Sequence, residues 1–168
     1  HASEAGADAI KLQIRSNNLF SLDSTDSFDL SAQISYSEVK RTNLSYKSSR
    51  NILNYAKTKG LNVIVTPFDN SALEEVKTWN IDALKIASCD LTNLPLVKNI
   101  SETGFPVIVS TGMSNESEIL KARDILEKSG CNFSFLHCNS TYPSPESDLN
   151  LKYIQRLHNL TSRVVGYS

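Results

Sequence analysis

The sequence predicts an α/β protein with a parallel sheet, and its regularity favours a (β/α) barrel. Short apolar runs alternate with amphipathic stretches along nearly the whole chain, which is typical of strands joined by crossover helices. Three successive runs are evenly spaced, with centres at Ile64, Ile86 and Ile108. A doubly wound dinucleotide-binding sheet is disfavoured because no G-x-G-x-x-G motif follows any predicted strand.

The six predicted strands are short and mostly β-branched or aliphatic. That composition is expected for strands that are buried on both faces of a parallel sheet. They cover residues 9–14, 62–66, 83–87, 106–110, 133–137 and 163–167.

Local signals place helices between these strands. Gly60 is a suitable C-terminal stop for the helix that precedes the second strand. Ser71 can cap the next helix, with Glu74 completing a capping box. Ser114 or Asn115 begins the helix after the fourth strand. The last helix is predicted from an apolar stripe at Leu151, Ile154 and Leu157.

The first connection is unusually long. Residues 15–42 separate the first strand from its helix and are rich in Ser, Asp and Asn, which predicts a long loop or a partly ordered lid. Three aromatic side chains in it could pack over a substrate or simply anchor the loop: Phe20, Phe28 and Tyr36.

Composition excludes several classes of protein. The 168 residues suit one domain, and 17 Lys and Arg against 18 Asp and Glu argue against a nucleic-acid binder. The longest apolar runs are strand-sized, so no membrane span is expected. Three cysteines without a C-x-x-C spacing disfavour a disulfide framework or a structural zinc site, and a reducing, cytoplasmic location is the simplest interpretation.

Polar residues gather at the predicted strand ends. In parallel α/β folds the carboxyl ends of the strands face the functional site. Lysines within apolar strands are costly unless they meet an anion or a carboxylate, and hydroxyls beside them suit phosphate or carboxylate oxygens. No pair of acids follows the strands, which argues against a two-carboxylate glycosidase. We therefore predict a site for an anionic, phosphorylated small molecule.

Single residues leave alternatives open. Lys85 could be a salt-bridged lysine of the sheet or a Schiff-base lysine. His137 could be a core histidine or a metal ligand. Cys138 is better explained as a small buried apolar residue than as a nucleophile.

Six ordered motifs carry a resemblance to a known family, the sialic acid synthases, which include N-acetylneuraminate synthase and its legionaminate and pseudaminate relatives. They are Lys11-Leu12-Gln13, Thr66-Pro67-Phe68-Asp69, Lys85-Ile86-Ala87-Ser88, Ser110-Thr111-Gly112-Met113, His137-Cys138 with Tyr142-Pro143-x-Pro145, and Gly166-Tyr167-Ser168.

This resemblance implies a TIM (β/α)8 barrel that condenses phosphoenolpyruvate with an N-acylated amino sugar, giving a nine-carbon 2-keto acid and phosphate. It assigns Gln13 and Tyr142 to the sugar, and His137 falls outside the family's metal-ligand positions. It assigns phosphoenolpyruvate binding to Lys11, Thr66, Lys85, Ser88, Ser110, Ser140 and Ser168.

The resemblance also implies parts that residues 1–168 do not contain. Such a barrel typically has about 250 residues, and these residues match about strands 2 to 7 as a partial synthase barrel domain. The family's catalytic Glu is expected before residue 1, and its His ligands for Mn²⁺ or Mg²⁺ and its antifreeze-like domain are expected after residue 168. The complete protein is expected to be a homodimer, and the isolated piece to be inactive.

Two other functions remain open from the sequence. One is a class I aldolase that uses Lys85 as a Schiff base. The other is a non-catalytic barrel fragment that only binds an anionic ligand. The motifs also do not decide between mannosamine-type, legionaminate-type and pseudaminate-type acceptors.

Overall fold

The computed structural model describes residues 1–16 and 37–168, and its centre is one sheet of six parallel strands. Each strand pairs with the next strand in sequence, so the sheet order is β1-β2-β3-β4-β5-β6. The predicted parallel α/β arrangement is confirmed. The strands are β1 (Ala9–Ile14), β2 (Asn62–Pro67), β3 (Ala83–Ile86), β4 (Val107–Ser110), β5 (Phe133–His137) and β6 (Val165–Tyr167).

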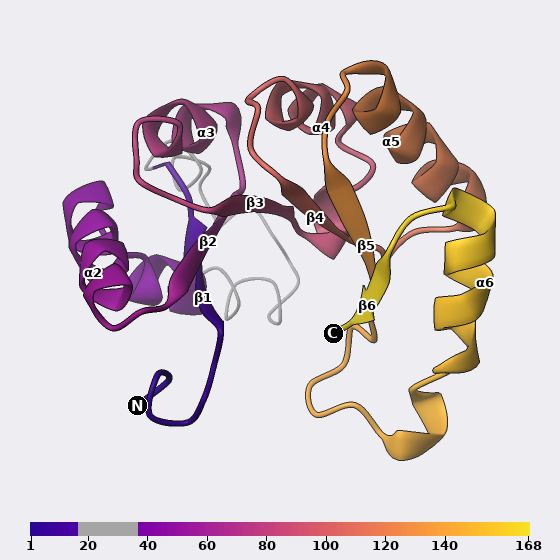
Figure 1. The fold of residues 1–168 in the computed structure, drawn as a ribbon, viewed down its shortest axis with the longest axis horizontal. Coiled ribbons are helices and arrows are strands. Elements are labelled where there is room, and N and C mark those ends of the chain that lie inside the picture. The colour runs from indigo at the N-terminus through magenta and orange to yellow at the C-terminus, as the bar shows by residue number, and fades with distance from the viewer. Residues whose placement is uncertain (17–36) are drawn as a thin grey trace.

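The helices follow the strands around one side of the curved sheet, as in the wall of a barrel (Figure 1). The α-helices are α2 (Tyr46–Thr58), α3 (Asn70–Val76), α4 (Leu94–Ser101), α5 (Glu116–Lys128) and α6 (Lys152–Thr161). Two short 3-10 helices add to them, η3 (Ser88–Asp90) and η4 (Glu146–Asp148). In the described ranges no helix is long and apolar enough to cross a membrane.

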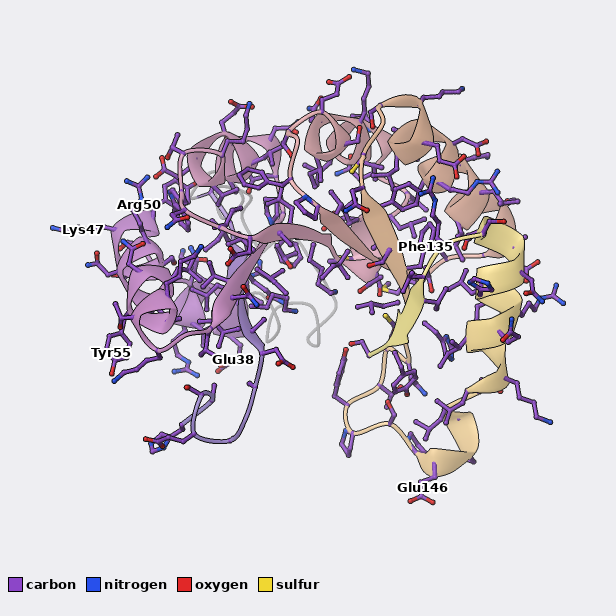
Figure 2. The ribbon with its side chains drawn as sticks, viewed as in Figure 1. Glu38, Lys47, Arg50, Tyr55, Phe135 and Glu146 are labelled. Atoms are coloured by element: carbon purple, nitrogen blue, oxygen red, sulfur yellow. The ribbon has the colours of Figure 1, made fainter. Side chains whose placement is uncertain are left out.

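The hydrophobic core fills the space between the sheet and these helices. Side chains alternate across a strand, so Val63 and Val65 of β2 are buried in this layer and face away from the concave side of the sheet. Figure 2 shows Phe135 of β5 in the interior, whereas Lys47 and Tyr55 extend outward from α2. The alternate residues of each strand face the concave side of the sheet.

Helix caps confirm one sequence prediction and correct another. The side-chain oxygen of Asn115, one of the two predicted positions, caps α5, and Glu118 completes a capping box that the sequence analysis did not predict. The predicted cap at Ser71 is wrong, because the carboxylate of Asp69 accepts the N–H of Ala72 at 2.8 Å and α3 begins earlier. Asp69 leaves the strand in an extended conformation, which suits an N-cap, and an acid binds free N–H groups well.

The prediction for the last helix is confirmed only in part. α6 is present, with Leu157 fully buried and Ile154 half-buried. Leu151 precedes the helix and is 53% exposed, so the apolar stripe is shorter than predicted. Gly60 lies just after α2 with φ +77°, a left-handed conformation that favours glycine, as predicted for a helix end.

The long first connection is described only at its ends. Residues 37–42 are helical, so this end of the predicted loop is not irregular. Phe20, Phe28 and Tyr36 lie outside the described residues.

Candidate active site at the carboxyl ends of the strands

One cavity of ≈ 270 Å³ collects every residue that the sequence proposed for a binding site. It opens at the carboxyl ends of the strands, as expected for a parallel α/β fold. A larger hollow of ≈ 510 Å³ lies on the outer side near α6 and contains none of these residues. The sequence-proposed residues among its lining are Lys11, Gln13, Thr66, Lys85, Ser88, Ser110, Ser140, Tyr142 and Ser168.

Sheet register explains why residues from distant parts of the chain meet there. Gln13 of β1 is the direct partner of Thr66 of β2, so both extend from the same level of the sheet. Lys85 of β3 and Ser110 of β4 lie two residues apart in register, since Lys85 pairs with Ile108. Side chains two residues apart share one face of a sheet.

Lys85 is the more buried of the two lysines in the cavity, and no counter-charge for it is found in the described part of the chain. Its Nζ donates to Ser110 Oγ at 2.5 Å. Burial lowers its pKa below the usual 10.5, and the positive charge of Lys11 lowers it further. No Asp or Glu is among the described residues that line the cavity, and no described carboxylate forms a salt bridge with Lys85. Among the described residues Lys85 therefore has no ion-pair partner, and their side chains give the cavity a positive charge.

The side chain of Thr66 also lines this cavity, and its hydroxyl is buried. Its side chain is only 1% exposed, and its Oγ1 has no hydrogen-bond partner in the described part of the chain. An unsatisfied buried hydroxyl costs about 1–3 kcal/mol. A ligand with oxygen acceptors in the cavity would satisfy it.

Gly112 joins three of the loops around the cavity, a contact that sequence reasoning missed. Its N–H donates to Ser88 Oγ at 3.2 Å, and its carbonyl accepts from Ser140 Oγ at 3.2 Å. A Cβ at this position would lie 2.8 Å from Ser140 Oγ and 2.9 Å from Cys138 Cβ. Only glycine therefore lets the loops after β3, β4 and β5 approach so closely.

Two residues at the rim differ in how firmly they are held. Tyr142 is 80% exposed, so it can reach only the outer part of a ligand. Gln13 accepts a hydrogen bond from Arg15 Nη2 at 2.7 Å. Nearby, Asp69 accepts the backbone N–H of Ser16 at 2.9 Å and so links the segment after β1 to the start of α3.

His137 and Cys138 have structural roles. His137 Nε2 lies 2.9 Å from the carbonyl oxygen of Leu149, and its ring packs between Tyr153 and Tyr167, away from the cavity. Cys138 is buried and its Sγ donates to a backbone carbonyl, which agrees with the interpretation as a small buried residue.

The described residues do not provide a metal site. In residues 1–16 and 37–168, no three His, Cys, Asp or Glu side chains are grouped so that they could hold an ion. The Mn²⁺ or Mg²⁺ expected from the resemblance therefore has no ligand set here, and we assign it no step.

Known proteins resemble the chain along its whole length. Residues 1–168 match the NeuB family. An uncharacterized protein of Methanocaldococcus jannaschii is 38% identical over 99% of this chain and 48% of its own length. The N,N'-diacetyllegionaminic acid synthase of Campylobacter jejuni is 32% identical over 99% of this chain and 53% of its own length.

A solved structure agrees with the sequence relatives. The sialic acid synthetase of Leptospira borgpetersenii, crystallised with citrate, superposes with a TM-score of 0.86 at 32% identity. The superposition covers 99% of this chain and 55% of that protein. The chain thus spans about half the length of the relatives it matches.

Proposed function

This chain belongs to the NeuB family, and from that premise we propose that the full-length protein is a sialic-acid-type synthase. It joins phosphoenolpyruvate to an N-acylated amino sugar, such as an N-acetylmannosamine-like sugar, and releases phosphate. The observation that carries the proposal is the cavity itself, where two lysines and a buried unpaired hydroxyl meet with no described carboxylate to neutralise them.

Phosphoenolpyruvate fits the charge of this cavity. It carries a phosphate and a carboxylate, and Lys11 and Lys85 can neutralise one anionic group each. Thr66 Oγ1, which has no partner among the described residues, would gain an acceptor from the ligand. The remaining hydroxyls supply further donors and belong to Ser88, Ser110, Ser140 and Ser168.

The reaction that we propose forms one carbon–carbon bond and breaks one carbon–oxygen bond. The enol carbon of phosphoenolpyruvate attacks the open-chain aldehyde of the sugar. Water then adds to the adjacent carbon, and phosphate leaves with the bridging oxygen. In this scheme Lys11 and Lys85 hold the substrate and stabilise its charges, and neither forms a covalent adduct.

The sugar is placed at the outer part of the cavity. Gln13 offers an amide and Tyr142 an exposed ring and hydroxyl at the rim, which suits a polar, neutral ligand better than a second anion. The names of the relatives indicate N-acylated sugars of the legionaminic and sialic acid type. We propose this acceptor class for the present protein.

An assay of the full-length protein tests the proposal. Phosphoenolpyruvate labelled with ¹⁸O in the bridging position is incubated with Mn²⁺ and a panel of N-acylated amino sugars. We expect sugar-dependent phosphate release with the label in phosphate. Absence of release with every sugar would contradict the proposal. Borohydride trapping of pyruvate on Lys85 would instead identify a class I aldolase, and binding without turnover a non-catalytic anion-binding protein.

A further inference from the structure

Arg15 lies at the rim of the cavity and is used neither by the sequence motifs nor by the proposed reaction. It is half-buried and follows the two cavity residues of β1. Its Nη2 donates to Gln13 Oε1 at 2.7 Å, and its guanidinium lies 3.9 Å from the centre of the Phe68 ring. Gln13 and Phe68 both line the cavity. Arg15 therefore contacts the cavity wall at two points.

This contact determines the orientation of the Gln13 amide. An arginine side chain has only donors, so the atom of Gln13 that faces Arg15 must be the carbonyl oxygen. The amide nitrogen Nε2 is then the group left for other partners. No described residue accepts a hydrogen bond from it, although Gln13 lines the cavity.

The two contacts hold Arg15 at a partly buried position. Burial lowers the pKa of Arg15 below its usual value, and electrostatic interaction with Cys89 and Asp90, which follow β3, offsets this only in part. Cys89 Sγ lies 3.7 Å from Asp90 Oδ2, so these two groups contact each other after β3. With its guanidinium over the Phe68 ring and its Nη2 bonded to Gln13, Arg15 is positioned as a donor to Gln13.

We propose that Arg15 is a positioning residue that keeps Gln13 Nε2 available as a donor to the acceptor sugar. The inference rests on the proposed function. It specifies that the sugar places an oxygen acceptor at this point of the rim, either the carbonyl of its acyl group or a hydroxyl. Arg15 acts through Gln13 and does not bind phosphoenolpyruvate.

Kinetics of the full-length protein test the proposal. Arg15→Met removes the donors while keeping an unbranched side chain over Phe68. We expect about a ten-fold rise in KM for the sugar, as for loss of one well-oriented hydrogen bond, with KM for phosphoenolpyruvate unchanged. In a Gln13→Ala background the same substitution should add almost nothing, because the two residues act as one unit.

Two further variants separate positioning from a general structural effect. Arg15→Lys keeps a charge and a donor and should restore most of the sugar affinity, and it also serves if Arg15→Met does not fold. Arg50→Met is the matched control, because Arg50 also contacts an aromatic ring, that of Trp79, and donates to Glu75, yet lies outside the cavity.

Each outcome has one meaning. An unchanged sugar KM in Arg15→Met, an equal rise in both substrates' KM, or full additivity with Gln13→Ala would each overturn the role of Arg15. Failure of the unsubstituted protein to release phosphate would overturn the proposed function instead, since that measurement does not involve Arg15.

Discussion

The lysines at the two ends of β3 differ in their partners. At the amino end, Lys57 of α2 donates to the carboxylate of Asp82 at 3.0 Å, and the same carboxylate accepts the N–H of Val63 at 2.7 Å. At the carboxyl end, Lys85 has a hydroxyl partner, Ser110, and no described carboxylate. The first lysine is neutralised within the fold, whereas the second is left for a ligand. Charge pairing thus distinguishes the amino end of the sheet, where the lysine is paired, from the carboxyl end, where we propose that a ligand pairs with it.

Replacing each lysine should give the largest contrast. In the full-length protein, Lys85→Met is expected to weaken phosphoenolpyruvate binding by about 100-fold or more, because a partly buried anion loses its charged partner. Lys57→Met should lower the melting temperature and leave that affinity unchanged. Calorimetric titration and thermal unfolding of both variants measure this. Similar affinity losses in the two variants would remove the distinction between the ends.

Glycines at the two ends sharpen the comparison. Gly112→Ala places a methyl group against Ser140 and Cys138, so we expect about a ten-fold loss of phosphoenolpyruvate affinity and a stability cost of about 1–3 kcal/mol. Gly104→Ala, before β4, meets no atom within 4 Å but has φ +81°, which costs about 1–2 kcal/mol in stability alone. Equal affinities of the two variants would show that the Gly112 contact does not shape the cavity.

Two buried hydroxyls, those of Thr66 and Ser49, have no hydrogen-bond partner in the ranges that the structure describes, and replacing them should give a smaller, matched effect. Thr66→Val should leave the free protein as stable or stabilise it by up to about 1 kcal/mol, yet weaken phosphoenolpyruvate binding about five- to ten-fold. Ser49→Ala removes the corresponding unpaired hydroxyl of α2, outside the cavity, and should change stability without changing affinity. Chemical denaturation and calorimetry distinguish the two, and a Thr66→Val variant of unchanged affinity would count against a ligand contact there.

The smallest effect concerns pH at the amino end. Burial by itself raises the pKa of Asp82, but the Val63 N–H and Lys57 lower it more, so the net pKa lies below 3.8. The Asp82 carboxylate therefore stabilises the fold at pH values above 3.8. This contribution is lost as the pH falls through the lower pKa of Asp82 in the folded protein.

We expect Asp82→Asn to cost under about 1 kcal/mol at pH 7, because the pair is partly exposed. The cost should shrink as the pH falls below 3.8. Urea unfolding of both proteins across pH measures this, and a cost that did not change with pH would contradict the assignment.

The parts that the sequence predicted depend on regular rules. Strand alternation and parallel topology together place residues after successive strands on one rim, which is why Lys11 and Ser168 could be grouped from sequence. Their roles with phosphoenolpyruvate remain proposals. The same rules found six strands within a residue or two of their observed bounds.

The parts that sequence reasoning missed depend on contacts without a local pattern. Gly112 matters because Ser88 and Ser140, 24 and 28 residues away, meet its backbone. The capping-box pattern pointed to Ser71 for α3, whereas Asp69 caps this helix and also accepts the backbone N–H of Ser16. Two hydrogen bonds between one side chain and different segments can be recognised only from the three-dimensional structure.

The sequential order of the sheet has a consequence for how the protein assembles. Every strand pairs with neighbours in the chain, so each βα unit can add to the one before it as the polypeptide is synthesised, without waiting for a distant partner. The cavity differs, because it needs Lys11 from β1 and Ser168 from just beyond β6. A ligand that spans them can bind only after the last unit has docked, and its binding energy then opposes unfolding of the whole sheet.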